Sequence, residues 1–273
     1  IITAPFSPLG NDTHIASADA TCVVLPTNQP IAPARNEGEL MRDVNQEQPF
    51  HPVYNYAYIT DAKEGLIVAD LSTLVDGEPR NNHLERSATW NGDGALTGAR
   101  HMVLGGKYAY IIADAGLVVV NLEDPLSPRV EATVPLNNGH SVALQFRYLF
   151  VTDADGLKVI DITDPTQPRL TPDNTIALAQ ARRLHLARTY AYVAAGAEGV
   201  AIVNIGQPEK MRLLQAFKDG LSDPYDVTVA STNASLFAYV ADGNGGLKVL
   251  QLTSPDSQPK FYGFSPEPKP ELI

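Results

Sequence analysis

The sequence predicts an all-β fold, a β-propeller built from four-stranded blades, and two observations support this prediction. A phrase made of an aromatic strand, a Gly-containing turn and a second apolar strand occurs five times along the 273 residues. The copies are YAYITDAKEGLIVADL from Tyr56, YAYIIADAGLVVVNL from Tyr108, YLFVTDADGLKVIDI from Tyr148, YAYVAAGAEGVAIVNI from Tyr190 and FAYVADGNGGLKVLQL from Phe237. A repeat of roughly 40–50 residues with several strands in each unit is typical of a propeller blade.

Each repeat carries the signs of four strands. Before the aromatic phrase lies a segment of alternating polar and apolar residues, such as ARHMVLGG from Ala99, which predicts an inner strand. The Val/Ile-rich segment after the turn, such as residues 117–120, suits a strand buried on both faces between neighbouring blades. A proline phrase such as Ser127-Pro128-Arg129-Val130 then introduces an outer strand, because an edge strand tolerates a residue without a backbone donor.

The turn between the second and third strands begins with aspartate in four repeats and ends with glycine in all five. These aspartates are Asp61, Asp114, Asp153 and Asp242. The fourth repeat has Ala194 and Ala195 instead. An aspartate side chain accepts hydrogen bonds from nearby backbone amides, and glycine supplies a positive φ at low steric cost. We therefore expect tight turns in which the aspartates have a structural role.

The two ends of the chain are less regular. Residues 1–40 show no repeat and are interpreted as an irregular N-terminal arm, although residues 21–25 could form an isolated strand. Arg42-Asp43-Val44 resembles Tyr225-Asp226-Val227 at the start of the last inner strand, so residues 40–58 are interpreted as an elongated start of the first blade. The five-bladed β-propeller is thus predicted at residues 41–273, with its last outer strand incomplete. We expect residues outside this chain, or the N-terminal segment, to complete the ring.

Composition argues against several classes of protein. The formal net charge of −11 disfavours a nucleic-acid-binding surface, which needs clustered basic residues. No apolar run reaches the roughly 18–20 residues of a membrane-spanning helix. Cys22 is the only cysteine, so the chain can form no internal disulfide and has no C-x-x-C-H motif for haem attachment. The chain also begins without Met or a leader, from which we expect a processed product or a piece of a longer protein.

The phrase that follows the turn also carries a resemblance to a known family. Residues 116–120 read GLVVV and residues 156–161 read GLKVID, and each is followed by Asp-Pro-x-x-Pro at residues 124–128 and 164–168. This combination resembles the LVIVD repeat family over roughly residues 40–273. The resemblance implies β-propellers of bacterial and archaeal extracytoplasmic or cell-surface proteins, most of which have no assigned activity. It supplies no catalytic residues.

A second resemblance concerns the first repeat. The stretch HPVYNYAYITDAKEGLIV, with NNHLERSATWNGDG after it, looks like the propeller segment of large bacterial proteins that accompany multihaem c-type cytochromes. This resemblance implies a place in an electron-transfer protein or complex. Because the chain has no C-x-x-C-H motif, any haem would be held by neighbouring domains or subunits and not by these residues.

The strongest candidate site lies at the starts of the inner strands. Alignment of the repeats brings six residues to two adjacent positions there: Arg100, His101, His140, Arg182, Arg183 and Tyr225. In a propeller these strand starts gather at the mouth of the central channel, where Arg and His side chains could bind a small anion. The alternative is structural, because the turn aspartates emerge on the same face and could pair with the arginines. A protein-binding surface is the third interpretation.

Metal and catalytic motifs are weak by comparison. Residues 153–156 (DADG) and 242–246 (DGNGG) resemble the first half of a calcium loop, but both lack the distal glutamate and also suit tight turns. The six histidines show no metal-binding spacing, which leaves only convergence of His101 and His140 in space. No nucleophile elbow, phosphate loop or H-E-x-x-H motif occurs. We predict no metal site and no cofactor held by this chain.

The sequence favours a non-catalytic, extracytoplasmic β-propeller, in the periplasm or at the cell surface, that acts as a protein-binding or scaffold module. The expected partners are other protein subunits or domains, and not nucleic acid. The alternative is the propeller portion of a multihaem cytochrome protein or complex, with cytochromes as partners. A second alternative is an enzyme with its active site in the central channel, because loops on a propeller can assemble a site that leaves no motif.

Overall fold

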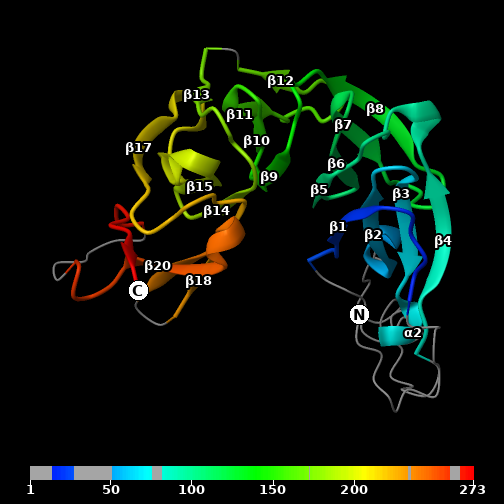
Figure 1. Cartoon of the computed structure of the whole chain (residues 1–273). Coiled ribbons are helices and arrows are strands. Elements are labelled where there is room, and N and C mark those ends of the chain that lie inside the picture. Colours follow the sequence, from blue (N-terminus) through cyan, green and yellow to red (C-terminus); the bar gives the residue numbers. More distant parts are fainter. Residues whose placement is uncertain (1–13, 28–50, 76–81, 172, 233–234, 259–264) are drawn as a thin grey trace, which may run out of the picture. The chain divides into compact units, whose positions relative to one another are not determined.

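The computed structural model describes residues 14–27, 51–75, 82–171, 173–232, 235–258 and 265–273. The chain divides into two compact units, Ile1–Thr133 and Val134–Ile273. Figure 1 shows short antiparallel strands in both. Within the described residues, no helix is long and apolar enough to cross a membrane.

The first unit contains two four-stranded antiparallel sheets, in which each strand pairs with the next along the chain. The first sheet is formed by β1 (Ala20–Val24), β2 (Tyr56–Asp61), β3 (Gly65–Asp70) and β4 (Glu85–Trp90). The second sheet is formed by β5 (His101–Gly105), β6 (Tyr108–Ala113), β7 (Gly116–Asn121) and β8 (Arg129–Val134), whose last residue reaches the unit boundary.

The second unit contains three sheets with the same order of strands. The third sheet has β9 (Ser141–Gln145), β10 (Tyr148–Asp153), β11 (Gly156–Asp161) and an outer edge shared by β12 (Arg169–Leu170) and β13 (Ile176–Ala177). The fourth has β14 (Leu184–Ala187), β15 (Tyr190–Ala194), β16 (Val200–Asn204) and β17 (Arg212–Phe217). The fifth has β18 (Asp226–Ser231), β19 (Leu236–Ala241), β20 (Leu247–Thr253) and β21 (Glu271–Leu272).

Within the described residues, the helical elements are single turns in the connections. One is an α-helical turn, α2 (Ser72–Val75). The others are 3-10 turns: η3 (Pro52–Asn55), η4 (Gly92–Gly94), η5 (Gly196–Glu198), η6 (Pro208–Lys210) and η7 (Gly243–Gly245). The propeller-type fold predicted from the repeats is therefore confirmed, because each of the five repeats lies in its own antiparallel sheet, with four strands in four of the sheets and a fifth short strand at the outer edge of the third.

The innermost strand of the first sheet comes from an unexpected part of the chain. β1 pairs with β2 through Val23 and Ile59 and through Val24 and Tyr58, so the first sheet takes its inner strand from within residues 1–40. The sequence predicted an irregular arm there, with a possible isolated strand at residues 21–25, and the start of the first blade at residues 40–58. Arg42-Asp43-Val44, on which that interpretation depended, lies outside the described residues.

Sheets within a unit pack through a repeated pair of faces. The third residue of the aromatic phrase and the residue after the turn glycine lie in a buried cluster with the second strand of the next sheet. In the first unit, Tyr58 and Leu66 share such a cluster with Ala109 and Ile111. In the second unit the clusters are Phe150 and Leu157 with Ala191 and Val193, then Tyr192 and Val200 with Ala238 and Val240. Tyr58 and Tyr192 are fully buried in these clusters.

Candidate functional site

The six residues predicted to form a site all lie at the starts of inner strands. Arg100 and His101 lie at the start of β5 in the first unit, and the other four lie at the starts of β9, β14 and β18 in the second. Equivalent backbone hydrogen bonds to the second strand of each sheet hold these strand starts in place. The amide of Arg100 donates to the oxygen of Ile112 at 2.9 Å, and the amide of Arg182 donates to that of Ala194 at 2.9 Å. The repeats therefore place these residues as the alignment predicts.

Two of the six side chains meet in the second unit, in a group that we call the Arg182 cluster and that consists of Arg182, Asp223 and Tyr225. Nη1 of Arg182 lies 2.9 Å from Oδ1 of Asp223 and donates to the carbonyl oxygen of Pro224 at 3.3 Å. The guanidinium carbon lies 5.2 Å from the centre of the Tyr225 ring. The cluster therefore joins the start of β14 to the start of β18.

A buried carboxylate fixes the loop that carries this cluster. Asp242, at the turn of the fifth repeat, is 1% exposed. It accepts hydrogen bonds from the amides of Ser222 and Asp223 at 2.9 and 2.8 Å, and the carbonyl of Pro224 accepts one from the amide of Gly196 at 3.1 Å. The Arg182 side chain is thus held against a rigid loop, while Tyr225 stays 59% exposed.

Arg100 has a different partner. Its guanidinium bonds Oδ1 of Asp114, the aspartate of its own repeat's turn, and its Nε donates to the carbonyl of Gly98 at 2.9 Å. The salt-bridge alternative is therefore right for Arg100, whereas Arg182 pairs with Asp223 and not with a turn aspartate. His101, His140 and Arg183 also make interactions of their own. None of these contacts shows an anion site.

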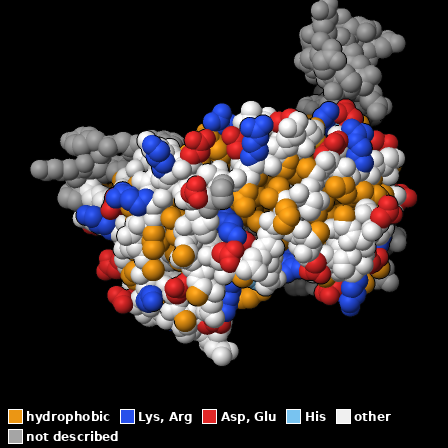
Figure 2. All heavy atoms as spheres, turned by 90° about the horizontal axis from the view of Figure 1, so that it is seen from above, with side chains coloured by type: hydrophobic (Ala, Val, Ile, Leu, Met, Phe, Trp, Pro, Cys, Tyr) orange, Lys and Arg blue, Asp and Glu red, His pale blue; other side chains and the backbone are white. Residues whose placement is uncertain are grey.

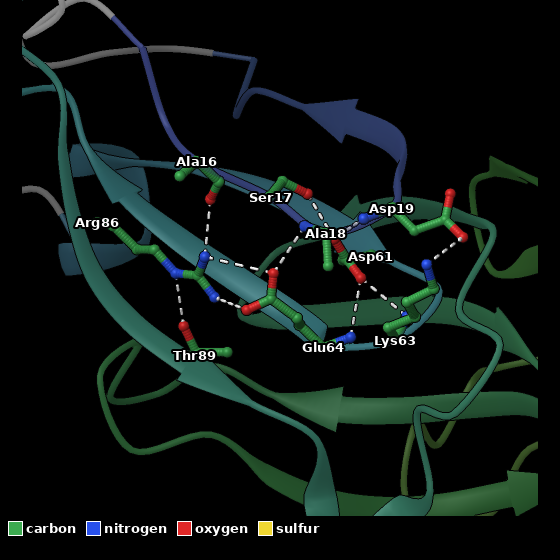
Figure 3. A network of polar contacts seen from close by, with 9 residues as sticks. All are labelled: Ala16, Ser17, Ala18, Asp19, Asp61, Lys63, Glu64, Arg86 and Thr89. Carbon is green, nitrogen blue, oxygen red and sulfur yellow. Dashed lines mark hydrogen bonds and ion pairs between the residues drawn. The ribbon is translucent and has the colours of Figure 1, made fainter.

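The turn aspartates do more than cap their own turns, and Asp61 shows how (Figure 3). Asp61 is fully buried. Its Oδ1 accepts the amides of Lys63 and Glu64, both at 2.8 Å, as the sequence predicted for a tight turn. Its Oδ2 accepts the amide of Asp19 at 2.7 Å and the hydroxyl of Ser17, which hold the segment before β1 onto the turn.

The pKa of Asp61 reflects this environment. Burial alone would raise the pKa of this carboxyl, but the hydroxyl of Ser17 and the amides of Asp19, Glu64 and Lys63 donate to the charged form. Together these donors hold the pKa of Asp61 well below its usual range. Asp61 is therefore an ionised, fully hydrogen-bonded structural carboxylate and not a poised acid or base.

A second part of the same network lies at the edge of the first sheet (Figure 3). Arg86 of β4 pairs with Glu64, and it donates to the carbonyl of Ala16 at 2.7 Å. Oε1 of Glu64 accepts the amide of Ala18 at 2.9 Å. The sequence did not indicate this network, because residues 16–19 carry no repeat.

The fourth repeat, which lacks the turn aspartate, makes the equivalent contact with other side chains. Oε1 of Gln180, in the segment before β14, accepts the amide of Ala197 in the turn at 3.0 Å. Oε2 of Glu198, in the turn, accepts the amide of Ala179 at 2.9 Å. Two side chains thus tie the turn to the segment before the inner strand, where a single aspartate does so in the first, third and fifth sheets.

One of the two loops that resembled half a calcium site, residues 153–156, binds a lysine side chain. Nζ of Lys158 lies 2.6 Å from Oδ2 of Asp153 and 2.6 Å from Oδ2 of Asp155. Burial would lower the pKa of Lys158, but these two carboxylates raise it overall, so the ammonium stays charged. Across the described ranges, no group of three or more His, Cys, Asp or Glu side chains could hold a metal ion.

The surface mixes both signs of charge. Figure 2 shows Lys and Arg side chains interspersed with Asp and Glu on one face, with hydrophobic side chains in patches between them. A nucleic-acid-binding face concentrates positive charge instead.

The comparisons with known proteins agree with the repeat pattern. The profile of the LVIVD repeat matches residues 54–74, 98–134, 138–172, 180–219 and 236–263. No curated protein matches the chain.

Solved structures share the fold at low sequence identity. The β-propeller domain of Cps50 (Swd1) from Myceliophteria thermophila is 10% identical with a TM-score of 0.57, over 94% of this chain and 72% of that one. A protein from Lactobacillus plantarum is 14% identical with a TM-score of 0.57, over 80% and 67%. A functionally unknown protein from Desulfotomaculum acetoxidans is 11% identical with a TM-score of 0.55, over 75% of this chain and 64% of that chain, less than two thirds of its length. At these identities the likeness concerns the fold alone.

Proposed function

The chain belongs to the LVIVD repeat family, and on that premise we propose that it is a non-catalytic β-propeller that binds another protein and serves as a scaffold module. The proposal places it outside the cytoplasm, in the periplasm or at the cell surface, with no cofactor of its own. One observation carries it most directly: the Arg182 cluster presents an exposed tyrosine beside a fixed arginine.

The chemistry of the Arg182 cluster suits a protein partner better than a small anion. Nη1 of the guanidinium lies 2.9 Å from the carboxylate of Asp223, which offsets the positive charge that would attract a phosphate or carboxylate, and the guanidinium stacks near the Tyr225 ring. Tyrosine and arginine are the residue types that contribute most at protein interfaces. A tyrosine held in place before binding loses little conformational entropy when a partner covers it.

The rigidity of the loop that carries the Arg182 cluster also supports a binding role. The loop of the Arg182 cluster is fixed by the buried carboxylate of Asp242 and by a backbone bond to Gly196. Function in such folds resides in loops held by a rigid frame of strands. The cluster meets this description.

The test is capture of partners from an extract of the source by the immobilised chain. Arg182→Ala combined with Tyr225→Ala should weaken binding of a captured protein at least about tenfold, which corresponds to about 1.4 kcal/mol. The matched control is Arg212→Ala, which removes an exposed arginine of β17 in the same unit. Equal binding by the double variant and the control, with both folded, would contradict the proposed site.

A further inference from the structure

The inner strand of the first sheet reaches its place through a longer connection than the equivalent strands do. Residues 25–55 separate β1 from β2. In the second, third and fourth sheets the inner and second strands are joined by two residues, at 106–107, 146–147 and 188–189. A two-residue hairpin requires both strands to come from one chain, whereas a chain as long as residues 25–55 can reach up to roughly 100 Å when extended. The connection therefore allows β1 to pair with the second strand of another molecule.

The residues just before β1 are held mainly through their backbone (Figure 3). Oδ2 of Asp61 accepts the amide of Asp19 at 2.7 Å, and Oε1 of Glu64 accepts the preceding amide at 2.9 Å. Nη1 of Arg86 donates to the carbonyl of Ala16 at 2.7 Å. Backbone amides and carbonyls are common to nearly all residue types, so three charged side chains of the first sheet recognise the course of a peptide here more than its side chains.

Two hydroxyl side chains add a sequence preference to this backbone recognition. The hydroxyl of Ser17 donates to Oδ2 of Asp61. The hydroxyl of Thr21 lies 2.8 Å from the carbonyl oxygen of Ala99 and 2.9 Å from the hydroxyl of Thr60. The site therefore favours a peptide with hydroxyl residues four positions apart. All of these contacts lie within the first unit.

An empty site would leave a buried carboxylate without part of its hydrogen bonding. Asp61 is fully buried, and the segment before β1 supplies two of its hydrogen bonds, from Ser17 and Asp19. Loss of the segment would also leave the inner edge of β2 unpaired. A buried polar group without its partners is costly, and an open strand edge pairs readily with another chain. Occupation of the site is therefore favoured, whichever chain supplies the segment.

We propose that the inner edge of the first sheet is a binding site for a peptide that adds a strand, filled within one chain by residues 16–24 and open to the same segment of a second copy of this chain. In the exchanged pair, each copy donates residues 16–24 to the other, and every contact of the site is kept. This site lies in the first unit and the Arg182 cluster lies in the second, so each proposal can fail without the other.

Disulfide trapping between two different copies tests the exchange. Val23 lies directly opposite Ile59 in the pairing of β1 with β2. One copy carries Val23→Cys and the other carries Ile59→Cys, both in a Cys22→Ser background, and the two are mixed, incubated and oxidised under native conditions. Residues opposite each other on paired strands are close enough to be bridged, so a disulfide between the copies reports that β1 of one has paired with β2 of the other. We expect this product, with a yield that rises with protein concentration.

Two controls accompany this measurement. A single chain with both Val23→Cys and Ile59→Cys should close its own disulfide, which shows that the two positions suit a bridge. A copy with Val130→Cys in place of Ile59→Cys presents its cysteine on β8, which does not pair with β1, and should give at least about tenfold less mixed disulfide. A mixed disulfide no more abundant than in this control, or a single chain that fails to close its bridge, would overturn the proposal.

A free peptide tests the recognition of the segment separately from the pairing of two copies. The probe is a synthetic peptide of residues 14–27 with Val23→Cys and Cys22→Ser, which should form a disulfide with the copy that carries Ile59→Cys. Ser17→Ala together with Thr21→Val in the peptide should slow this reaction at least about tenfold, because both hydroxyl contacts are lost. Equal rates for the two peptides would contradict recognition at this site.

Discussion

Asp61 illustrates how single polar residues hold this fold together. The carboxylate is fully buried and accepts four hydrogen bonds, two from its own turn and two from the segment before β1. The sequence predicted the bonds within the turn from the aspartate and the following glycine. It could not predict Ser17 and Asp19 as partners, because they approach through the tertiary pairing of β1 with β2.

Replacement of this carboxylate should have a pH-dependent effect on stability. The pKa of Asp61 in the folded protein is lowered below the unfolded value of about 3.9, so its ionised form stabilises the fold. That contribution is fully present above the unfolded pKa and is lost as the pH falls through the folded pKa. Asp61→Asn should therefore lower the free energy of unfolding by roughly 2–3 kcal/mol near neutral pH. In urea unfolding, the difference should shrink below about pH 4; a constant difference would contradict this explanation.

Phe146 is a strained residue whose replacement should stabilise the protein. It begins the two-residue loop between β9 and β10 with a φ of 54°, and its side chain is 92% exposed. Glycine occupies the same place in the second sheet, where Gly106 has a φ of 58°. Because asparagine tolerates this conformation better than phenylalanine, Phe146→Asn should raise the free energy of unfolding by about 0.5–1 kcal/mol. Phe146→Ala, which removes the exposed ring but tolerates this conformation less well than asparagine, is the control. If the urea midpoint of Phe146→Asn is no higher than that of the unaltered protein, the strain is not supported.

At the scale of the element, the turn glycines differ in why they are needed. Gly199 has a φ of 82°, and an added Cβ would lie 2.0 Å from the carbonyl oxygen of Phe217 on the neighbouring strand. Gly246 has a φ of 73° but open space around that position. The sequence predicted the positive φ at both, but the approach of the outer strand could not be known from the repeat.

These two glycines give a matched prediction. Gly246→Ala should cost only its backbone conformation, with a φ of 73° and a ψ of −146°, about 1–3 kcal/mol, whereas Gly199→Ala should cost roughly 2 kcal/mol more because the outer strand must also move. Thermal and urea unfolding of the two variants provide the comparison. Equal losses of unfolding free energy in the two variants would contradict this prediction, because the backbone conformation alone would then explain why glycine is needed at both positions.

The elements that the sequence predicted are those with a local pattern. The aromatic strand, the turn and the Val/Ile-rich strand appear as β2–β3, β6–β7, β10–β11, β15–β16 and β19–β20. β1 was not predicted as the inner strand of the first sheet, because its residues do not resemble those of the other inner strands. Only its register against β2, with Val24 opposite Tyr58, assigns it to that sheet.

At the scale of the whole molecule, the repeat explains both the fold and the candidate site. One alignment placed Arg100, Arg182 and Tyr225 at equivalent strand starts, and the structure confirms these positions. The partners of the two arginine side chains differ. Arg100 pairs with an aspartate of its own repeat, and Arg182 pairs with an aspartate of the next repeat. The sequence could therefore predict where the candidate side chains lie but not the contacts that decide their chemistry.

The measurement that tests the proposed function most directly is site-specific photo-cross-linking of the chain in its source cells. A photoreactive phenylalanine analogue at Tyr225 should cross-link a partner protein, since Tyr225 is 59% exposed beside Arg182. The same analogue at Phe146, which lies beyond the opposite end of an inner strand, serves as the control and should give none of that adduct. If the adduct is a multihaem cytochrome, the partner belongs to an electron-transfer assembly. If Tyr225 gives no adduct, or the same adducts as Phe146, the Arg182 cluster is not the partner-binding surface.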